Sequence, residues 1–118
     1  MKMAYTPYRG EIEPVTDIRK AEITLHDEYV EVIYSYDYTY MSESGRGPES
    51  INSAYLIPKY GLGVSRTESV HALDPDKEDV PMVTFESPCM DAVWIRCKSK
   101  KEADNIYLNL RKYLLDNE

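Results

Sequence analysis

The stretch that decides the fold covers residues 30–40 and reads Val30-Glu31-Val32-Ile33-Tyr34-Ser35-Tyr36-Asp37-Tyr38-Thr39-Tyr40. Its even-numbered positions are all valine or tyrosine, and its odd-numbered positions are polar except for Ile33. Successive side chains of a β-strand point to opposite faces, so this alternation predicts a strand with one buried and one solvated face. The expected strand spans about residues 28–41, well beyond the usual length of roughly five or six residues. We therefore expect it to bend or bulge within a curved sheet.

Shorter alternating runs on both sides of this strand indicate a β-rich chain. Strands are expected at 21–26, 51–57, 64–67, 70–73, 82–86 and 92–98. The polar run 42–50 contains two glycines and a proline, which predicts a hairpin loop. A second, acidic loop is expected at 74–79. In the last strand, Val93 and Ile95 fall on one side and Trp94 and Arg96 on the other.

The two ends of the chain differ. Residues 1–17 contain Pro7, Gly10 and Pro14 and little periodicity, so they are expected to form a partly ordered arm before a domain at 18–118. Ser99 and Glu102 have the spacing of a capping box, in which each side chain satisfies a backbone donor of a helix N-terminus. Apolar residues then recur at helical spacing through Leu114, which predicts one amphipathic C-terminal helix.

Composition bounds the possible roles. The chain has 118 residues, of which 42% are hydrophobic and 30% charged, as expected for a single folded domain. Its net charge of −7 disfavours direct binding to nucleic acid or to anionic membranes. No run is long enough for a membrane helix and no apolar leader begins the chain, so we expect a cytoplasmic protein. Cys89 and Cys97 lie too far apart along an extended strand to pair, which predicts two free thiols.

Residue types that carry chemistry are present but scattered. His26 and His71 have no metal-ligand spacing with each other or with the cysteines. The acidic loop lacks the glycine and the final glutamate of a calcium loop, and the segment 45–47 is not a phosphate-binding loop. Asp37 with Glu31 is a weak candidate for acid–base chemistry. We therefore predict no catalytic residue, metal or cofactor, and a protein that is not an enzyme.

Two groups of residues are candidates for binding. Residues 96–118 carry six basic and four acidic side chains, whereas residues 1–95 carry eight and 17, so any anion site belongs near the C-terminal end. The densest group of basic residues in this region leads into the expected helix N-terminus, and a helix N-terminus favours bound negative charge. Tyr34 and Tyr36 are expected in the core, and the tyrosines nearer the loop are expected to be semi-exposed. The candidate binding residues are Arg96, Lys98, Lys100, Lys101, Tyr38 and Tyr40.

The order of elements resembles the pleckstrin-homology-like superfold. The passage from Val93 to Ala103, followed by Ile106, Leu110 and Leu114, looks like the last strand and capping helix of its bacterial members. The resemblance implies an α+β fold in which two near-orthogonal antiparallel sheets form a partly open barrel of six or seven strands, capped by one C-terminal α-helix. Members that bind phosphoinositides carry basic residues on the first hairpin, whereas the matching segment 25–29 is acidic here. Headgroup binding is therefore not carried over.

The resemblance also implies another mode of binding, in which a sheet edge or the groove beside the helix receives a peptide or another subunit. The leading hypothesis is a non-catalytic protein-binding or scaffold module whose partner is a protein, a peptide or a second copy of the chain. The alternative is an acidic mimic or inhibitor of a nucleic-acid-binding protein. This hypothesis is based on the net charge of −9 over residues 1–95. A third class, an enzyme dependent on a cysteine or a carboxylate, has no local signature in its favour.

Overall fold

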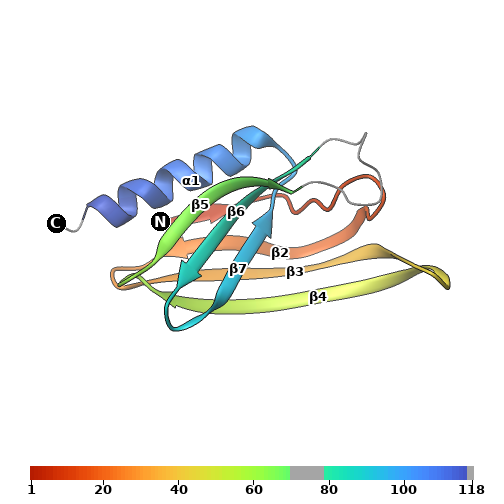
Figure 1. Ribbon diagram of the computed structural model, residues 1–118, viewed down its shortest axis with the longest axis horizontal. Helices are drawn as coiled ribbons and strands as arrows, with labels where there is room; N and C mark the ends of the chain where they lie inside the picture. The colour runs from red at the N-terminus through yellow and green to blue at the C-terminus, as the bar shows by residue number, and fades with distance from the viewer. Residues whose placement is uncertain (70–78, 117–118) are drawn as a thin grey trace.

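The computed structural model describes residues 1–69 and 79–116 of the chain and has an α+β architecture (Figure 1). The elements, in chain order, are β1 (Lys2–Ala4), β2 (Val15–Leu25), β3 (Tyr29–Ser42), β4 (Gly45–Pro58), β5 (Gly63–Ser69), β6 (Val80–Ser87), β7 (Met90–Arg96) and α1 (Lys100–Leu115). The strand expected at 70–73 lies outside the described residues, as does the acidic loop expected at 74–79 apart from Asp79.

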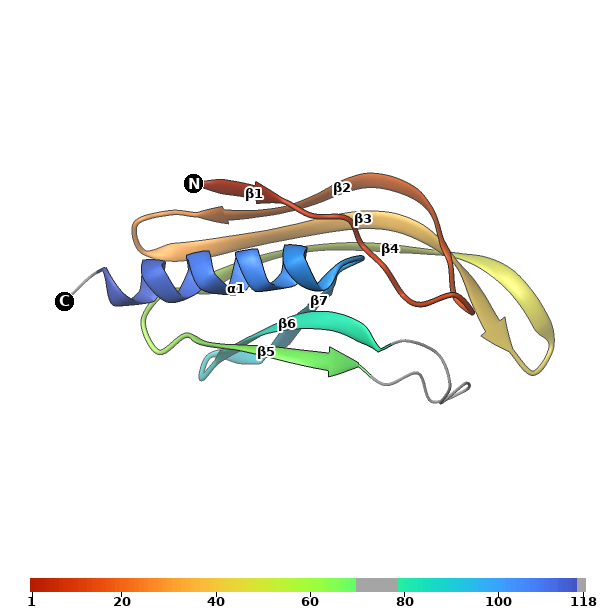
Figure 2. The same cartoon turned by 90° about the horizontal axis from the view of Figure 1, so that it is seen from above.

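The strands form two antiparallel sheets, one with the order β1-β2-β3-β4 and one with the order β5-β6-β7. The short strands of the second sheet cross the long strands of the first obliquely (Figure 1). Two antiparallel sheets and one C-terminal helix are as expected, but the sheets are not closed into a barrel. In the described part of the chain, an isolated bridge between Pro7 and Cys97 links the N-terminal segment to the end of β7. The hairpin of β3 and β4 extends beyond the described strands of the second sheet (Figure 2).

Strand β3 confirms the prediction made from its alternation. It runs from Tyr29 to Ser42, and Val30, Val32, Tyr34 and Tyr36 are buried on one face, which we call the inner face of the four-stranded sheet. The expected irregularity occurs in the neighbouring strand β2, whose register with β3 shifts twice. These shifts let the long sheet curve.

The hairpin expected at 42–50 forms, but its loop is shorter than expected and comprises only residues 43 and 44. Strand β4 already begins at Gly45, and its register with β3 is unbroken from Ser42–Gly45 to Tyr29–Pro58. The polar run is compatible with a strand because it pairs on one side only, with β3, and its side chains are mostly exposed. Gly45 has a φ of +119°, which supplies the backbone conformation that the tight turn needs.

The N-terminal segment is more ordered than expected. Strand β1 pairs with the last residues of β2, and the side chains of Met3 and Tyr5 are buried in the core. Residues 15–17, which were expected within the arm, belong to β2. A three-residue strand is too short to show a period in the sequence, which is why the alternation of Met3 and Tyr5 gave no signal.

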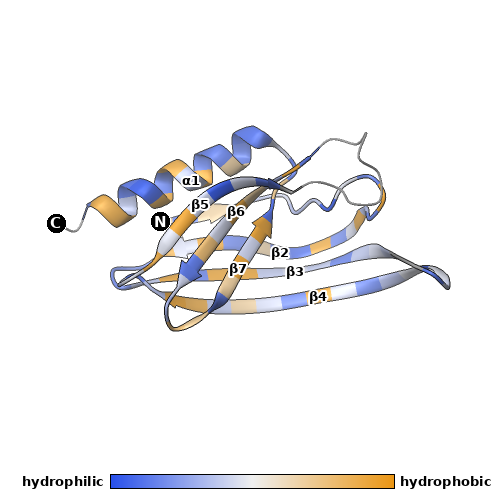
Figure 3. Cartoon of the chain, viewed as in Figure 1, coloured by the Kyte–Doolittle hydropathy of each residue, from blue (hydrophilic) through white to orange (hydrophobic). Residues whose placement is uncertain are grey.

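The core lies between the two sheets and the helix. The inner face of the four-stranded sheet packs with Val83, Phe85 and Ile95 of the second sheet and with Ile106 and Leu110 of α1. Helix α1 contacts β5 and β6 and lies on the side of the molecule where β1 and β5 are found (Figures 1 and 2). Figure 3 shows apolar and polar residues alternating along this helix, and a far end of the β3–β4 hairpin that is mainly hydrophilic. Within the described residues, no helix combines the length and apolar character needed to span a bilayer.

The capping box at the start of α1 forms in part. The hydroxyl of Ser99 accepts a hydrogen bond from the backbone N–H of Glu102 at 3.1 Å, as predicted. The carboxylate of Glu102 does not return the bond to Ser99 but accepts from the backbone N–H of Thr6. The helix N-terminus is therefore tied to the segment that follows β1.

Candidate functional site

A cleft of about 230 Å³ lies between strand β7 and the inner face of the four-stranded sheet. One wall is the run of consecutive residues 92–96 in β7. The opposite wall is aromatic and comes mainly from β3 and β4. Its lining residues are Tyr5, Tyr34, Tyr36, Ile51 and Tyr55.

The cleft follows the edge of β7 and not one of its faces. Val93 and Ile95 are buried on the core side of the strand, whereas Trp94 is 54% exposed on the outer face, yet all of them line the cleft. Consecutive side chains of a strand point in opposite directions, so a surface that touches every residue in turn must run along the backbone edge. Strand β7 pairs with β6 on one side. Its other side is used near its end, where the N–H of Tyr8 donates to the carbonyl oxygen of Arg96 at 3.2 Å.

The other sheet edges of the described residues are less suited to receive a strand. Strand β1 has only three residues, and β5 lies against α1. Strand β4 carries Pro48 and Pro58, and proline cannot donate a ladder hydrogen bond. Residues 92–95 of β7 contain no proline and border a cleft, so this edge is the one that is open to strand addition.

The aromatic wall is the inner part of a longer tyrosine row on β3. The ring centroids of Tyr34 and Tyr36 are 6.1 Å apart, and Tyr55 of β4 lies 6.2 Å from Tyr34. Burial raises the pKa of Tyr34 to about 12, and the pKa of Tyr5 is also raised by burial, so both hydroxyls are neutral at physiological pH. The wall therefore offers uncharged aromatic surface with hydroxyl groups that can still form hydrogen bonds.

The predicted binding residues Tyr38 and Tyr40 continue the same row toward the hairpin tip, with centroid separations of 6.3 Å from Tyr36 to Tyr38 and 6.5 Å from Tyr38 to Tyr40. Tyr38 is half-buried against the core, and the guanidinium group of Arg9 lies 3.9 Å from its ring centroid. Tyr40 is 44% exposed. Both have the semi-exposed environment expected from the sequence, but they lie beyond the residues that line the cleft.

The structure divides the predicted basic cluster. Arg96 is half-buried and lines the cleft, whereas Lys98, Lys100 and Lys101 are exposed and lie outside its lining. None of the four forms an ion pair with another described residue. At the helix N-terminus, the carboxylate of Glu102 already occupies the position beside the backbone of Thr6. This end of α1 therefore offers no preformed anion site. Of the four basic residues, Arg96 is the one that lines the cleft.

Two residues considered for catalysis lie in surroundings that disfavour it. Cys97 is buried, and burial raises its pKa to about 12, so it is not a thiolate nucleophile. Asp37, the candidate acid, accepts from Ser50 at 2.6 Å and from Arg19 at 2.9 Å, and these contacts lower its pKa. No cluster of three potential metal ligands occurs in the part of the chain that the structure describes.

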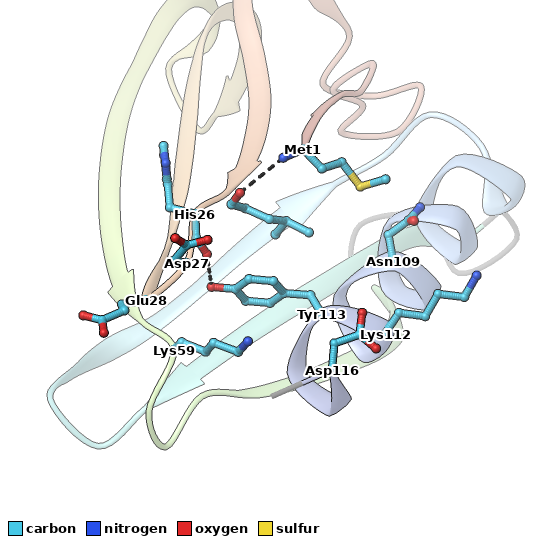
Figure 4. Close-up of a pocket in the computed structure, with 10 residues that line it drawn as sticks. Met1, His26, Asp27, Glu28, Lys59, Asn109, Lys112, Tyr113 and Asp116 are labelled. Atoms are coloured by element: carbon cyan, nitrogen blue, oxygen red, sulfur yellow. Dashed lines mark hydrogen bonds between the residues drawn. The ribbon is translucent and has the colours of Figure 1, made fainter. Parts of the chain in front are cut away.

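A hollow of about 490 Å³, larger than the cleft, lies at the C-terminal end of α1 (Figure 4). Tyr113 points from α1 toward the β2–β3 turn, and its hydroxyl donates to the carbonyl oxygen of His26 at 2.6 Å. The ammonium group of Lys59 lies 4.1 Å from the centroid of the Tyr113 ring. These contacts attach the helix to the sheet. We therefore assign the residues around this hollow a structural role, although the hollow is larger than the cleft.

Sequence reasoning did not identify the centre of the cleft. Trp94 was placed on the outward side of the last strand, but it was not singled out as a binding residue, and Tyr55 and Ile51 were not singled out either. The sequence did contain a signal for a binding surface, since Trp94 is the one tryptophan of the chain and lies at an outward position of a short strand. A cleft formed by residues 34–55 and 92–96 depends on long-range packing, which no local pattern reports.

Fold and site define a small α+β protein with two antiparallel sheets and an aromatic cleft beside an open strand edge. Comparison of the chain with protein-family models, with curated proteins and with solved structures finds no match.

Proposed function

We propose that the chain is a non-catalytic protein-binding module that receives an extended segment of a partner protein along the edge of β7. The observation that carries this proposal is the coincidence of an unpaired strand edge at residues 92–95 with a cleft whose far wall is aromatic. Strand addition to a sheet edge provides affinity through backbone hydrogen bonds, and side-chain pockets provide specificity. Each such bond contributes a net stabilisation of about 0.5–1.5 kcal/mol.

We further propose that the architecture is a partly open member of the pleckstrin-homology-like superfold. The division into four and three antiparallel strands followed by one helix supports this assignment. The open side of the two sheets is then the side that holds the cleft. We place the protein in the cytoplasm, which is supported by Cys89 and Cys97, two free thiols at opposite ends of β7.

The alternative function, mimicry of nucleic acid by acidic residues, finds less support. On the outer face of the four-stranded sheet, Arg19 lies 2.9 Å from Asp37 and 3.4 Å from Asp17. Lys2 lies 3.5 Å from Glu22 in the same sheet. A mimic presents unpaired acids to a basic groove, whereas these acids already have basic neighbours.

Two matched alanine variants test the proposal. Ala92 and Ala54 are both exposed strand residues, but Ala92 lines the cleft and Ala54 faces away from it on β4. Random seven-residue peptides displayed on phage would be selected on the wild-type chain and then tested on A92E and A54E. We expect selected peptides that bind wild type and A54E and lose binding to A92E, because a glutamate at residue 92 puts a charge and a longer side chain on the wall of the cleft.

Amide chemical shifts of residues 92–95 should move when a selected peptide is added. Absence of any selected peptide, or equal binding to A92E and A54E, would contradict the proposal. Sedimentation of the unbound proteins covers self-association. A concentration-dependent dimer that A92E abolishes would make a second copy of the chain the partner at this edge.

A further inference from the structure

We infer that the segment received by the β7 edge is acidic, with a carboxylate side chain that reaches the guanidinium group of Arg96 and apolar side chains on its neighbouring positions. This inference rests on the proposed function, since it specifies the chemistry of the strand that β7 receives. Its basis is the position of Arg96 within the cleft, the alternation of β7 and the distribution of charge in the chain.

The alternation of β7 determines which partner residues meet which surface. Ala92, Trp94 and Arg96 share the outer face, while Val93 and Ile95 point to the core. The N–H of Tyr8 already donates to the carbonyl oxygen of Arg96, so an added strand pairs along residues 92–95. Its residue opposite Trp94 lies on the same outer face and diagonal to Arg96, within reach of a long side chain, and the residue two positions away lies opposite Ala92. The intervening residues point inward, toward the tyrosine wall. The expected partner therefore has a carboxylate opposite Trp94 that reaches Arg96, an apolar residue facing the tyrosines, and an apolar residue opposite Ala92, at successive positions.

Arg96 is suited to a carboxylate. Its side chain is half-buried in the cleft and makes no ion pair with any described residue. A guanidinium group binds a carboxylate through charge-assisted hydrogen bonds, which are stronger than neutral ones and gain further where water is partly excluded. A lysine of the partner at this position would instead face a like charge, so the cleft should reject basic segments.

The wider charge distribution favours the same occupant. The chain as a whole has a net charge of −7, but residues 96–118 carry a net charge of +2. Lys98 follows Arg96 by two positions and is exposed. An acidic segment is therefore repelled by most of the surface and attracted to the end of β7, which increases its selectivity for this edge.

Capped five-residue peptides test the inference directly. An added strand can run parallel or antiparallel to β7, so two probes are used. They are acetyl-Glu-Val-Leu-Val-Thr-amide and the reverse sequence acetyl-Thr-Val-Leu-Val-Glu-amide. Each has a matched version in which glutamine replaces the glutamate, and a second in which lysine replaces it. Trp94 is the one tryptophan of the chain and lines the cleft, so its fluorescence reports binding without a label.

We expect at least one glutamate peptide to bind about tenfold or more tightly than its glutamine version, as charge-assisted hydrogen bonds predict. The lysine version should bind most weakly. R96M, which keeps most of the aliphatic volume, should remove the preference for glutamate. K20M is the control, because Lys20 is an exposed lysine of β2 outside the cleft, and it should retain the preference.

Equal affinity for the glutamate and glutamine peptides would overturn the inference and leave the proposed strand addition intact. Failure of every peptide, with selected library peptides still binding at residues 92–95, would overturn it in the same way. Failure of both the probes and the library would overturn the proposed function as well. The comparison of glutamate with glutamine uses the wild-type chain, so it decides the question even if R96M does not fold.

Discussion

At the scale of single residues, Arg19 organises the outer face of the four-stranded sheet. Its guanidinium group donates to Ser35 at 2.9 Å and to Asp37 at 2.9 Å, and Ser50 donates to the same carboxylate at 2.6 Å. The hydrogen bond from Ser50 and the contact with Arg19 lower the pKa of Asp37 below its ordinary value of 3.8. A carboxyl group held in its ionised form is a poor proton donor at neutral pH, so these contacts give Asp37 a structural role in the sheet.

The pH dependence of stability should reveal this network. Since the pKa of Asp37 is lower in the folded chain than in the unfolded chain, its contribution is present above about pH 3.8 and is lost as the pH falls through the folded value. We expect wild type to have a higher Tm than D37N at neutral pH, with a gap that closes under acid conditions. Thermal unfolding followed by circular dichroism measures both proteins.

The control for this experiment is E49Q, because Glu49 is an exposed acid of β4 that has no ion pair among the described residues. E49Q should follow wild type at every pH. A gap between wild type and D37N that stays constant down to acid pH would show that the carboxylate charge has no part in the network.

At the scale of elements, helix α1 is held by one buried stripe. Leu110 is fully buried, whereas Leu108 on the same helix is 54% exposed. L110A should lower the free energy of unfolding by about 2–5 kcal/mol, because it leaves a cavity in a packed core. L108A should change it by less than about 0.5 kcal/mol, as is usual at the surface. Urea denaturation of both variants measures the difference, and equal effects would mean that the helix does not dock as described.

The C-terminal end of α1 has its own attachment. The hydroxyl of Tyr113 donates to the carbonyl oxygen of His26 at 2.6 Å and lies 3.3 Å from that of Tyr29. Y113F removes this donor and should destabilise the protein by about 1 kcal/mol, with faster hydrogen exchange in the last turns of the helix. Y107F is the matched control, since Tyr107 is a half-buried tyrosine of α1 whose hydroxyl forms no hydrogen bond with a described residue. Unchanged exchange in Y113F would show that the ring alone holds the helix.

At the scale of the whole molecule, the core depends on neutral side chains that can lose a proton. Burial raises the pKa of Cys97 to about 12 from 9.0, that of Tyr34 to about 12 from 10.0, and that of Tyr5 further still. In the unfolded chain these groups release their protons at the ordinary values, so the unfolded state is favoured progressively as the pH rises above about 9. Their contribution to stability is fully present below that pH.

We therefore expect the Tm of the wild-type chain to fall steeply above about pH 9, with tyrosinate absorbance rising as the protein unfolds. Y5F removes one of the three groups and should make this fall less steep. Y60F is the control, because Tyr60 is 92% exposed, and its curve should match wild type. A Tm that stays level to strongly alkaline pH would mean that these side chains are not buried as described.

The whole shape also explains which expectations from the sequence were correct. The molecule has extents of 51 × 26 × 24 Å, and the β3–β4 hairpin extends along its length (Figure 1). The alternation from Val30 to Tyr40 predicted β3 because a period of two is a property of the strand itself. The run 42–50 looked like a loop because glycine and proline disfavour strands, but the ladder with β3 continues through it as far as Gly45. A neighbouring strand overrides weak local preference.

The sequence by itself determined the alternating strand β3, the amphipathic helix with its Ser99 cap, the two unpaired cysteines and the acidic charge balance, because each is set by residues close together in the chain. Only the tertiary structure decided that β7 keeps an open edge, and that its residues 92–96 line a cleft whose other wall carries tyrosines of β3 and β4. The physical reason is that strand pairing and sheet packing join segments about 40 to 60 residues apart, through burial and backbone hydrogen bonds that no local pattern encodes.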